Sequence, residues 1–182
     1  MYRLKVRIVG VTPLLQHRMT EESVESIESA TKTAGMKNMA APDAVAAKSL
    51  YRNKNGEACV NGDAIRLAIG KLGASIKKVG RVTWKANLLG SMTIMPSLVP
   101  IVPQEWETDS RPVVIPSTRG RQIRHRPRFD EWALEFGIVV FDDELPDVVI
   151  KDALMRAGVQ NGLGDNRLNG NGRFEIQSFE RQ

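Results

Sequence analysis

The chain has 182 residues, 42% of them hydrophobic, and carries 26 Lys and Arg against 21 Asp and Glu, for a formal net charge of +5. This length and composition fit one globular domain, and with only 5% aromatic residues its core must be mainly aliphatic. Cys59 is the only cysteine, which excludes an internal disulfide and a CxxC knuckle, and the two distant histidines, His17 and His125, do not favour a zinc site. We therefore expect no metal and no cofactor.

The sequence also lacks signs of a membrane association. No apolar run approaches the length of a membrane span. Residues 1–5 alternate charged and apolar side chains, unlike a signal peptide. We expect a cytoplasmic protein with no membrane partner.

Positive charge is concentrated in the middle of the chain. Residues 61–130 carry 12 basic and 5 acidic residues, whereas residues 131–182 carry 5 basic and 10 acidic residues. This asymmetry predicts a polyanionic partner for the middle segment. An ordinary solvated surface is the alternative.

Hydrophobic periodicity and turn residues predict the following elements in chain order. The first third of the chain reads as a strand over 3–11, a short helix over about 20–31, a loop over 35–42 and a hairpin over 48–60 around Asn55-Gly56. The middle reads as a helix capped by Asn61 and stopped by Gly80, a strand over 81–95, and a proline-rich connection over 96–130 with a short strand at 113–115. The last part reads as a strand over 131–141, a helix capped by Asp142 or Asp143 and closed by Gly158, and a strand over 173–179.

This order predicts an α+β fold. Without two insertions, at about 18–45 and 96–130, the elements read βαββαβ, the ferredoxin-like (RRM-like) order. Such a chain forms an antiparallel sheet with two helices on one face, and the other face is free for a ligand or partner. We expect residues 1–182 to form one such domain with long insertions.

A glycine-rich loop precedes the last predicted strand. Four glycines fall within eleven residues, which indicates unusual backbone conformations or a close approach of another group. Main-chain N–H groups in such a loop can cradle phosphates, and nearby arginines add charge. The candidate RNA-binding residues here are Gly162, Gly164, Arg167, Gly170, Gly172 and Arg173. A plain turn-forming connector is the alternative.

An arginine run lies upstream of this loop. Five arginines fall within residues 119–128 with no acidic residue among them, and the planar guanidinium pairs well with phosphate oxygens. The candidate RNA-binding residues here are Arg119, Arg121, Arg124, His125, Arg126 and Arg128. Lys77 and Lys78, at the end of the first long helix, are further candidates. The alternatives are a solvated basic loop, a charged outer helix face for the lysines, and an acidic protein partner, including a second copy of this chain.

The glycine pattern resembles that of RAMP proteins, the RNA-binding proteins of CRISPR effector complexes. The pattern is G-x-G, five residues, then G-x-G-x-aromatic at residues 162–174, and Gly62 to Leu67 is similar to the family's entry into its first helix. The likeness is greatest to Cas7-like backbone subunits, or to a phage or mobile-element relative. It implies an antiviral protein that holds single-stranded RNA, a guide RNA and its target among the candidates, by the phosphate backbone. It also implies that copies oligomerise along the RNA or join a multi-subunit ribonucleoprotein.

Two other functions stay open from the sequence. Relatives with a processing role use a histidine as a base for RNA cleavage, so His17 is a candidate for a metal-independent endoribonuclease. A phage single-stranded nucleic-acid-binding or assembly protein is the other alternative. The sequence does not distinguish RNA from DNA, and whether the chain is an enzyme stays open, with a binding role favoured.

Overall fold

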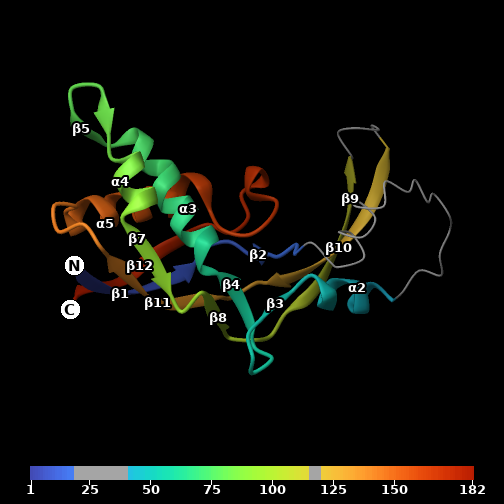
Figure 1. The fold of residues 1–182 in the computed structure, drawn as a ribbon. Helices are drawn as coiled ribbons and strands as arrows, with labels where there is room; N and C mark the ends of the chain where they lie inside the picture. The colour runs from blue at the N-terminus through green and yellow to red at the C-terminus, as the bar shows by residue number, and fades with distance from the viewer. Residues whose placement is uncertain (19–40, 115–119) are drawn as a thin grey trace, which may run out of the picture.

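A computed structural model describes residues 1–18, 41–114 and 120–182. The helix predicted over about 20–31 and Arg119 lie outside the described residues. The described part is α+β, with antiparallel sheets and four α-helices (Figure 1). None of the helices in these ranges is long and apolar enough to cross a membrane.

The elements have the following bounds. The strands are β1 (Tyr2–Gly10), β2 (Leu14–Leu15), β3 (Tyr51–Arg52), β4 (Ala58–Asn61), β5 (Lys77–Val79), β6 (Val82–Thr83), β7 (Met92–Met95), β8 (Leu98–Val102), β9 (Glu107–Val114), β10 (Arg121–Phe129), β11 (Ala133–Val140) and β12 (Phe174–Arg181). The helices are α2 (Pro42–Lys48), α3 (Gly62–Leu72), α4 (Lys85–Gly90) and α5 (Asp147–Arg156), with shorter helical turns η1 (Gly73–Ser75), η2 (Ala157–Asn161) and η3 (Arg167–Asn169).

The main sheet has seven strands in the order β12-β1-β11-β8-β4-β3, and β7 also pairs with β11. Every pairing in it is antiparallel. The alternation predicted for the first strand is confirmed, since Leu4, Val6 and Ile8 are buried on one face of β1. The strands predicted over 131–141 and 173–179 are confirmed as β11 and β12, and the hairpin predicted over 48–60 is confirmed as β3 and β4.

Helices α3, α4 and α5 lie on one side of the main sheet (Figure 1). Asn61 caps α3 as predicted, because its side chain accepts a hydrogen bond of 2.9 Å from the main-chain N–H of Asp63. The apolar stripe of α3, with Ile65 and Ile69 fully buried, packs into the core between the helices and the main sheet.

The other side of the sheet exposes the basic alternate residues of β1. Glu135 on β11 lies between two of them, with a carboxylate oxygen 2.8 Å from Lys5 Nζ and the other 3.6 Å from Arg7 Nη1. The hydrogen bond and charge of Lys5 lower the pKa of Glu135. Part of the positive charge of this face is therefore neutralised within the chain.

The prediction for residues 73–95 was wrong in two respects. Helix α3 ends at Leu72 rather than near Gly80, which instead has φ 57° in the turn between β5 and β6. Residues 85–90 form α4 rather than continuing a strand, because Leu88 is fully buried against the end of α3. Gly73 permits this packing, since a Cβ there would lie 2.6 Å from Leu88 Cδ1.

The connection predicted over 96–130 was also wrong, because most of it is strand. The hairpin of β9 and β10, with β2 on the other edge of β10, forms a second sheet that projects beyond the first, and α2 lies beside it (Figure 1). Pro112 and Pro127 lie within these strands, opposite Ile123 and Thr108 respectively. These prolines suggested a loop, but Pro112 lies on the edge strand β9, where proline is tolerated. Pro127 lies on β10 just before Arg128 and Phe129, the two residues that pair with β2.

Both ends of α5, the second long helix, differ from the sequence prediction as well. Asp142 accepts from the N–H of Glu144 in a turn, and Pro146 precedes the first residue of α5 without a side-chain cap. Gly158 does not close the helix, which continues as one π-helical stretch to a stop at Gly162, where φ is 71°. Gly158 is needed for packing instead, because a Cβ there would overlap the carbonyl oxygen of Phe174.

Gly158→Ala should lower the free energy of unfolding by about 1–3 kcal/mol, because a close-packed backbone contact has to move. Gly90→Ala is the matched control at the end of α4, where an added Cβ meets nothing within 4 Å, and should change it by less than about 1 kcal/mol. Urea denaturation followed by circular dichroism measures both. Equal effects of the two substitutions would contradict the packing described for η2.

Candidate nucleic-acid interface

The glycine-rich loop is held against the segment that follows β1. The N–H of Asp165 donates to Leu15 O at 2.7 Å, and the N–H of Gly172 donates to Pro13 O at 2.8 Å. Within the loop, the N–H of Leu163 donates to Gly172 O at 2.9 Å. The loop therefore has a defined shape set by hydrogen bonds to a distant part of the chain.

The glycines of this loop have structural roles. Gly162, Gly164, Gly170 and Gly172 all have φ between 71° and 83°. A Cβ at Gly164 would overlap Leu15 O, and one at Gly172 would overlap Leu163 O, whereas one at Gly170 would meet nothing within 4 Å. Because several main-chain N–H groups already donate within the chain, the part of the loop best placed to meet a ligand is its exposed tip, Arg167 to Asn169.

The described part of the arginine run lies on β10, where strand alternation divides it between two faces. Arg124, Arg126 and Arg128 share one face, and Arg121 and His125 share the other. The register with β9 places Arg124 opposite Arg111 and Arg126 opposite Asp109. The His125 face is the one toward α2, since Thr108, opposite Pro127 on that same face, donates a 2.6 Å hydrogen bond to Asp43.

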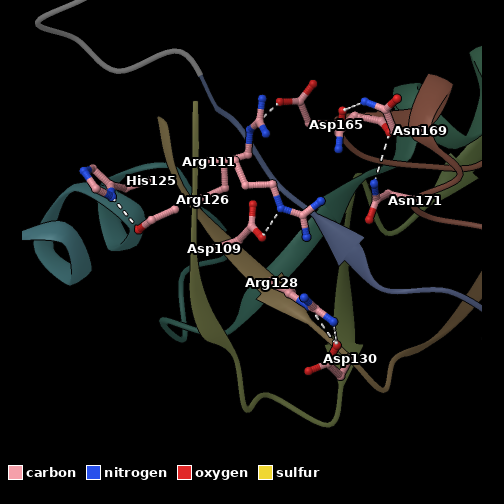
Figure 2. A network of polar contacts seen from close by, with 11 residues as sticks. Asp109, Arg111, His125, Arg126, Arg128, Asp130, Asp165, Asn169 and Asn171 are labelled. Atoms are coloured by element: carbon pink, nitrogen blue, oxygen red, sulfur yellow. Dashed lines mark hydrogen bonds and ion pairs between the residues drawn. The ribbon is translucent and has the colours of Figure 1, made fainter. Parts of the chain in front are cut away.

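Arg126 joins the hairpin to the glycine-rich loop. It is only 4% exposed, and its Nε lies 2.9 Å from Oδ2 of Asp165 (Figure 2). The two atoms are at ion-pair distance but are not aligned as a hydrogen bond. Asp109, opposite Arg126 on β9, is also buried. In this conformation the guanidinium of Arg126 is directed at a carboxylate of its own chain rather than at solvent.

The other members of the run differ in how far their charge is already paired. Arg128 Nη2 lies 2.6 Å from Asp130, and His125 Nδ1 lies 2.7 Å from Ser110 Oγ (Figure 2). Arg121 is exposed and Arg124 is half-buried, and within the described ranges neither forms an ion pair. These two arginines carry the charge that the hairpin can offer to an anion.

A cleft of about 490 Å³ lies between α3, the segment after β2, and the glycine-rich loop. Its lining includes two basic side chains, Lys71 and Arg167, together with His17, the carboxylates of Asp63 and Asp165, and one aromatic side chain, Tyr51. The cleft is close to the arginine-bearing face of the hairpin, because Asp165, the partner of Arg126, also lines it.

His17 lies at this cleft with a pKa below its ordinary value. Burial is the largest cause, and the neighbouring guanidiniums of Arg124 and Arg126 add to it, whereas Asp165 opposes the shift. The imidazole is therefore neutral at pH 7, which is the form that can accept a proton.

The remaining sequence candidates lie elsewhere or are internally bound. Lys77 and Lys78 are on the β5–β6 hairpin, well apart from β9 and β10 (Figure 1), and Lys78 Nζ is 4.5 Å from the centroid of the Trp84 ring. Arg173 Nη2 donates to Arg167 O at 3.3 Å. Among the described residues no group of three or more His, Cys, Asp or Glu side chains is arranged to hold a metal ion.

Sequence reasoning missed the contribution of β9 and of α3 to this region. Arg111, opposite Arg124, has its Nε 2.6 Å from Asp109 Oδ1, and Lys71 lines the cleft from α3. Neither residue stands out in the sequence. Arg111 comes to lie beside the arginine run only because β9 pairs with β10.

Comparison with known proteins gives a likeness in fold. No protein-family model matches the sequence, and no curated protein matches it. A chain in the cryo-EM structure of the type III-B Cmr-beta bound to cognate target RNA is similar in fold, with a TM-score of 0.63 and 11% sequence identity. The match covers 99% of this chain but only 60% of that one. At this identity the likeness shows a shared fold.

Asp165→Ala should lower the free energy of unfolding by about 3 kcal/mol, because it leaves the Arg126 guanidinium buried without its partner. The double variant Arg126→Met with Asp165→Ala should recover much of that loss, since both charges are then removed. Asp130→Ala is the control in the same hairpin, where a more exposed ion pair contributes less than about 1 kcal/mol. Denaturant titration of the four proteins measures these differences, and a double variant no more stable than Asp165→Ala would refute the pairing.

Proposed function

We propose that this chain is a ferredoxin-like RAMP protein, a Cas7-like subunit or a phage or mobile-element relative, that binds single-stranded RNA through its phosphate backbone. The strand order β12-β1-β11-β7 supports this fold, with α3 between β1 and β7 and α5 between β11 and β12. That arrangement supports the βαββαβ order, and we propose that residues 1–182 form one domain with insertions at about 18–45 and 96–130.

The observation that carries the proposal is the ion pair between Arg126 and Asp165. It joins the two segments that the sequence marks for phosphate binding, the arginine run and the glycine-rich loop, beside one cleft. A strand crossing this cleft would pass Arg124 on the hairpin and Arg167 on the loop tip. Both side chains are without an ion-pair partner among the described residues, as a phosphate contact requires.

This proposal gives the members of the arginine run different roles. Arg124 contacts phosphates on the face of β10 toward the cleft, Arg121 contacts them from the other face at the first residue of β10, and Arg126 positions the hairpin from within the protein. Arg119, outside the described residues, remains a proposed contact from the sequence, whereas Arg128, paired with Asp130, is a weaker one.

The cellular setting follows from the same proposal. The similar chain belongs to a structure that contains a target RNA, which favours RNA as the ligand here. We infer a cytoplasmic ribonucleoprotein in which copies of this chain, alone or with other subunits, line one RNA that serves as a guide.

Replacing Arg121, Arg124 and Arg167 together by Ala should weaken binding to a single-stranded RNA at least tenfold. It should also flatten the plot of log affinity against log salt, by about 0.7 for each phosphate that the variant no longer neutralises. The matched control replaces Arg3, Arg156 and Arg181 by Ala, which removes the same charge from β1, α5 and β12. Fluorescence anisotropy at several salt concentrations measures both proteins. If the two triple variants bind alike, the interface lies elsewhere.

A second candidate function is metal-independent RNA cleavage, which the neutral His17 in the cleft favours. His17 would accept the proton of the 2′-hydroxyl, and Lys71 or Tyr51, which line the same cleft, would be available to protonate the leaving oxygen.

RNA incubated with the protein in excess chelator should then be cut, and the rate should fall only as the pH drops through the lowered pKa of His17. His17→Ala should abolish cleavage. His125→Ala should not abolish cleavage, because the His125 ring is hydrogen-bonded to Ser110 on the hairpin. Intact RNA after prolonged incubation with the unaltered protein would exclude this enzyme and leave the binding function standing.

A further inference from the structure

The cleft beside the glycine-rich loop has a mixed lining with a substantial apolar part. Its lining includes a set of aliphatic side chains from four parts of the chain: Leu14, Val60, Ala64, Leu67, Ala68 and Leu163. Leu67, on α3, is 53% exposed and presents its aliphatic side chain to the cleft. Tyr51 adds an aromatic side chain to the same lining. Phosphate binding alone does not explain this apolar surface.

Several polar groups of the lining are already engaged within the protein. Gln16 donates to Cys59 O at 2.8 Å and accepts from the N–H of Tyr51 at 3.3 Å. The Asn61 side chain caps α3, and Asn161 Nδ2 donates to Gly162 O at 2.8 Å. The two carboxylates of the lining are paired as well, Asp63 with Arg66 and Asp165 with Arg126. The lining therefore offers a ligand more apolar and aromatic contact than free polar contact, while its cations, Lys71 and Arg167, have charged ends that can remain at the edge.

We propose that the cleft takes one unstacked nucleobase of the bound strand, which lies against Leu67 and Tyr51. The proposal rests on the RNA-binding function above and adds a base contact to it. Sugar and phosphate stay outside, near Arg124 and Arg167. A nucleobase has two apolar faces and a polar edge, and single-stranded RNA is commonly recognised by bases splayed out onto aromatic and aliphatic side chains. About 490 Å³ lies within the usual range for small-ligand sites, and so leaves room for a base.

The occupant is a base of any type rather than one identified base. Because Gln16, Asn61 and Asn161 are engaged within the protein, few side chains remain to read a base edge by hydrogen bonds. Stacking and apolar contact tolerate all four bases, since each has a π-face.

Two substitutions test the cleft without altering the cations at its edge. Ala64→Met places a larger side chain into it from an exposed position on α3, and Tyr51→Ala removes the aromatic side chain. Ala86→Met, at an exposed position on α4, is the matched control. The ligands are a ribo-oligonucleotide and an abasic oligomer of the same length and backbone.

Both cleft variants should bind the ribo-oligonucleotide about 5- to 100-fold more weakly than the unaltered protein, the range expected for loss of one stacked base. Their binding to the abasic oligomer and their salt dependence should stay unchanged, and Ala86→Met should match the unaltered protein throughout. Equal losses for both ligands, or no loss for either, would overturn the base contact and leave the phosphate interface in place. If the unaltered protein binds neither ligand, the proposed function fails with it.

Discussion

The ion pair between Arg126 and Asp165 is the interaction on which the arrangement of the candidate interface depends. It connects the β9–β10 hairpin, which projects beyond the main sheet, to the loop that precedes β12. Buried ion pairs add little net stability, because desolvation offsets their attraction, but breaking one by removing a single partner is costly. We interpret this pair as a constraint on position: it holds two basic segments beside one cleft.

The same interaction changes how the arginine run is understood. A dense run of arginines is not equivalent to a dense positive surface, because strand alternation divides it and carboxylates of the chain neutralise part of it. Arg126 is buried and paired, and Arg128 is paired with Asp130, so Arg121 and Arg124 are the described members with free charge. The cations that complete the interface, Lys71 and Arg167, come from other elements.

The parts of the fold that were predictable have local causes. Alternation defines β1 and β11, and Asn61 caps α3, because each signal depends on neighbouring residues only. The β9–β10 hairpin was not predictable in the same way, since its prolines suggested a loop and its pairing is a longer-range property. The two segments that we propose to bind phosphate stand out in the sequence, but the burial of Arg126 does not, because its partner Asp165 lies in a distant loop. For the same reason, the glycines of that loop looked like a phosphate cradle when packing against Leu15 and Leu163 accounts for two of them.

The central claim is that one strand of RNA contacts the hairpin and the glycine-rich loop of the same molecule. Photocrosslinking of RNA that contains 4-thiouridine, followed by mass spectrometry of the linked peptides, tests it most directly. Crosslinks should fall in peptides from β10 and from the loop tip around Arg167, on the two sides of the cleft. Crosslinks confined to the β5–β6 hairpin or to the exposed face of β1 would contradict it.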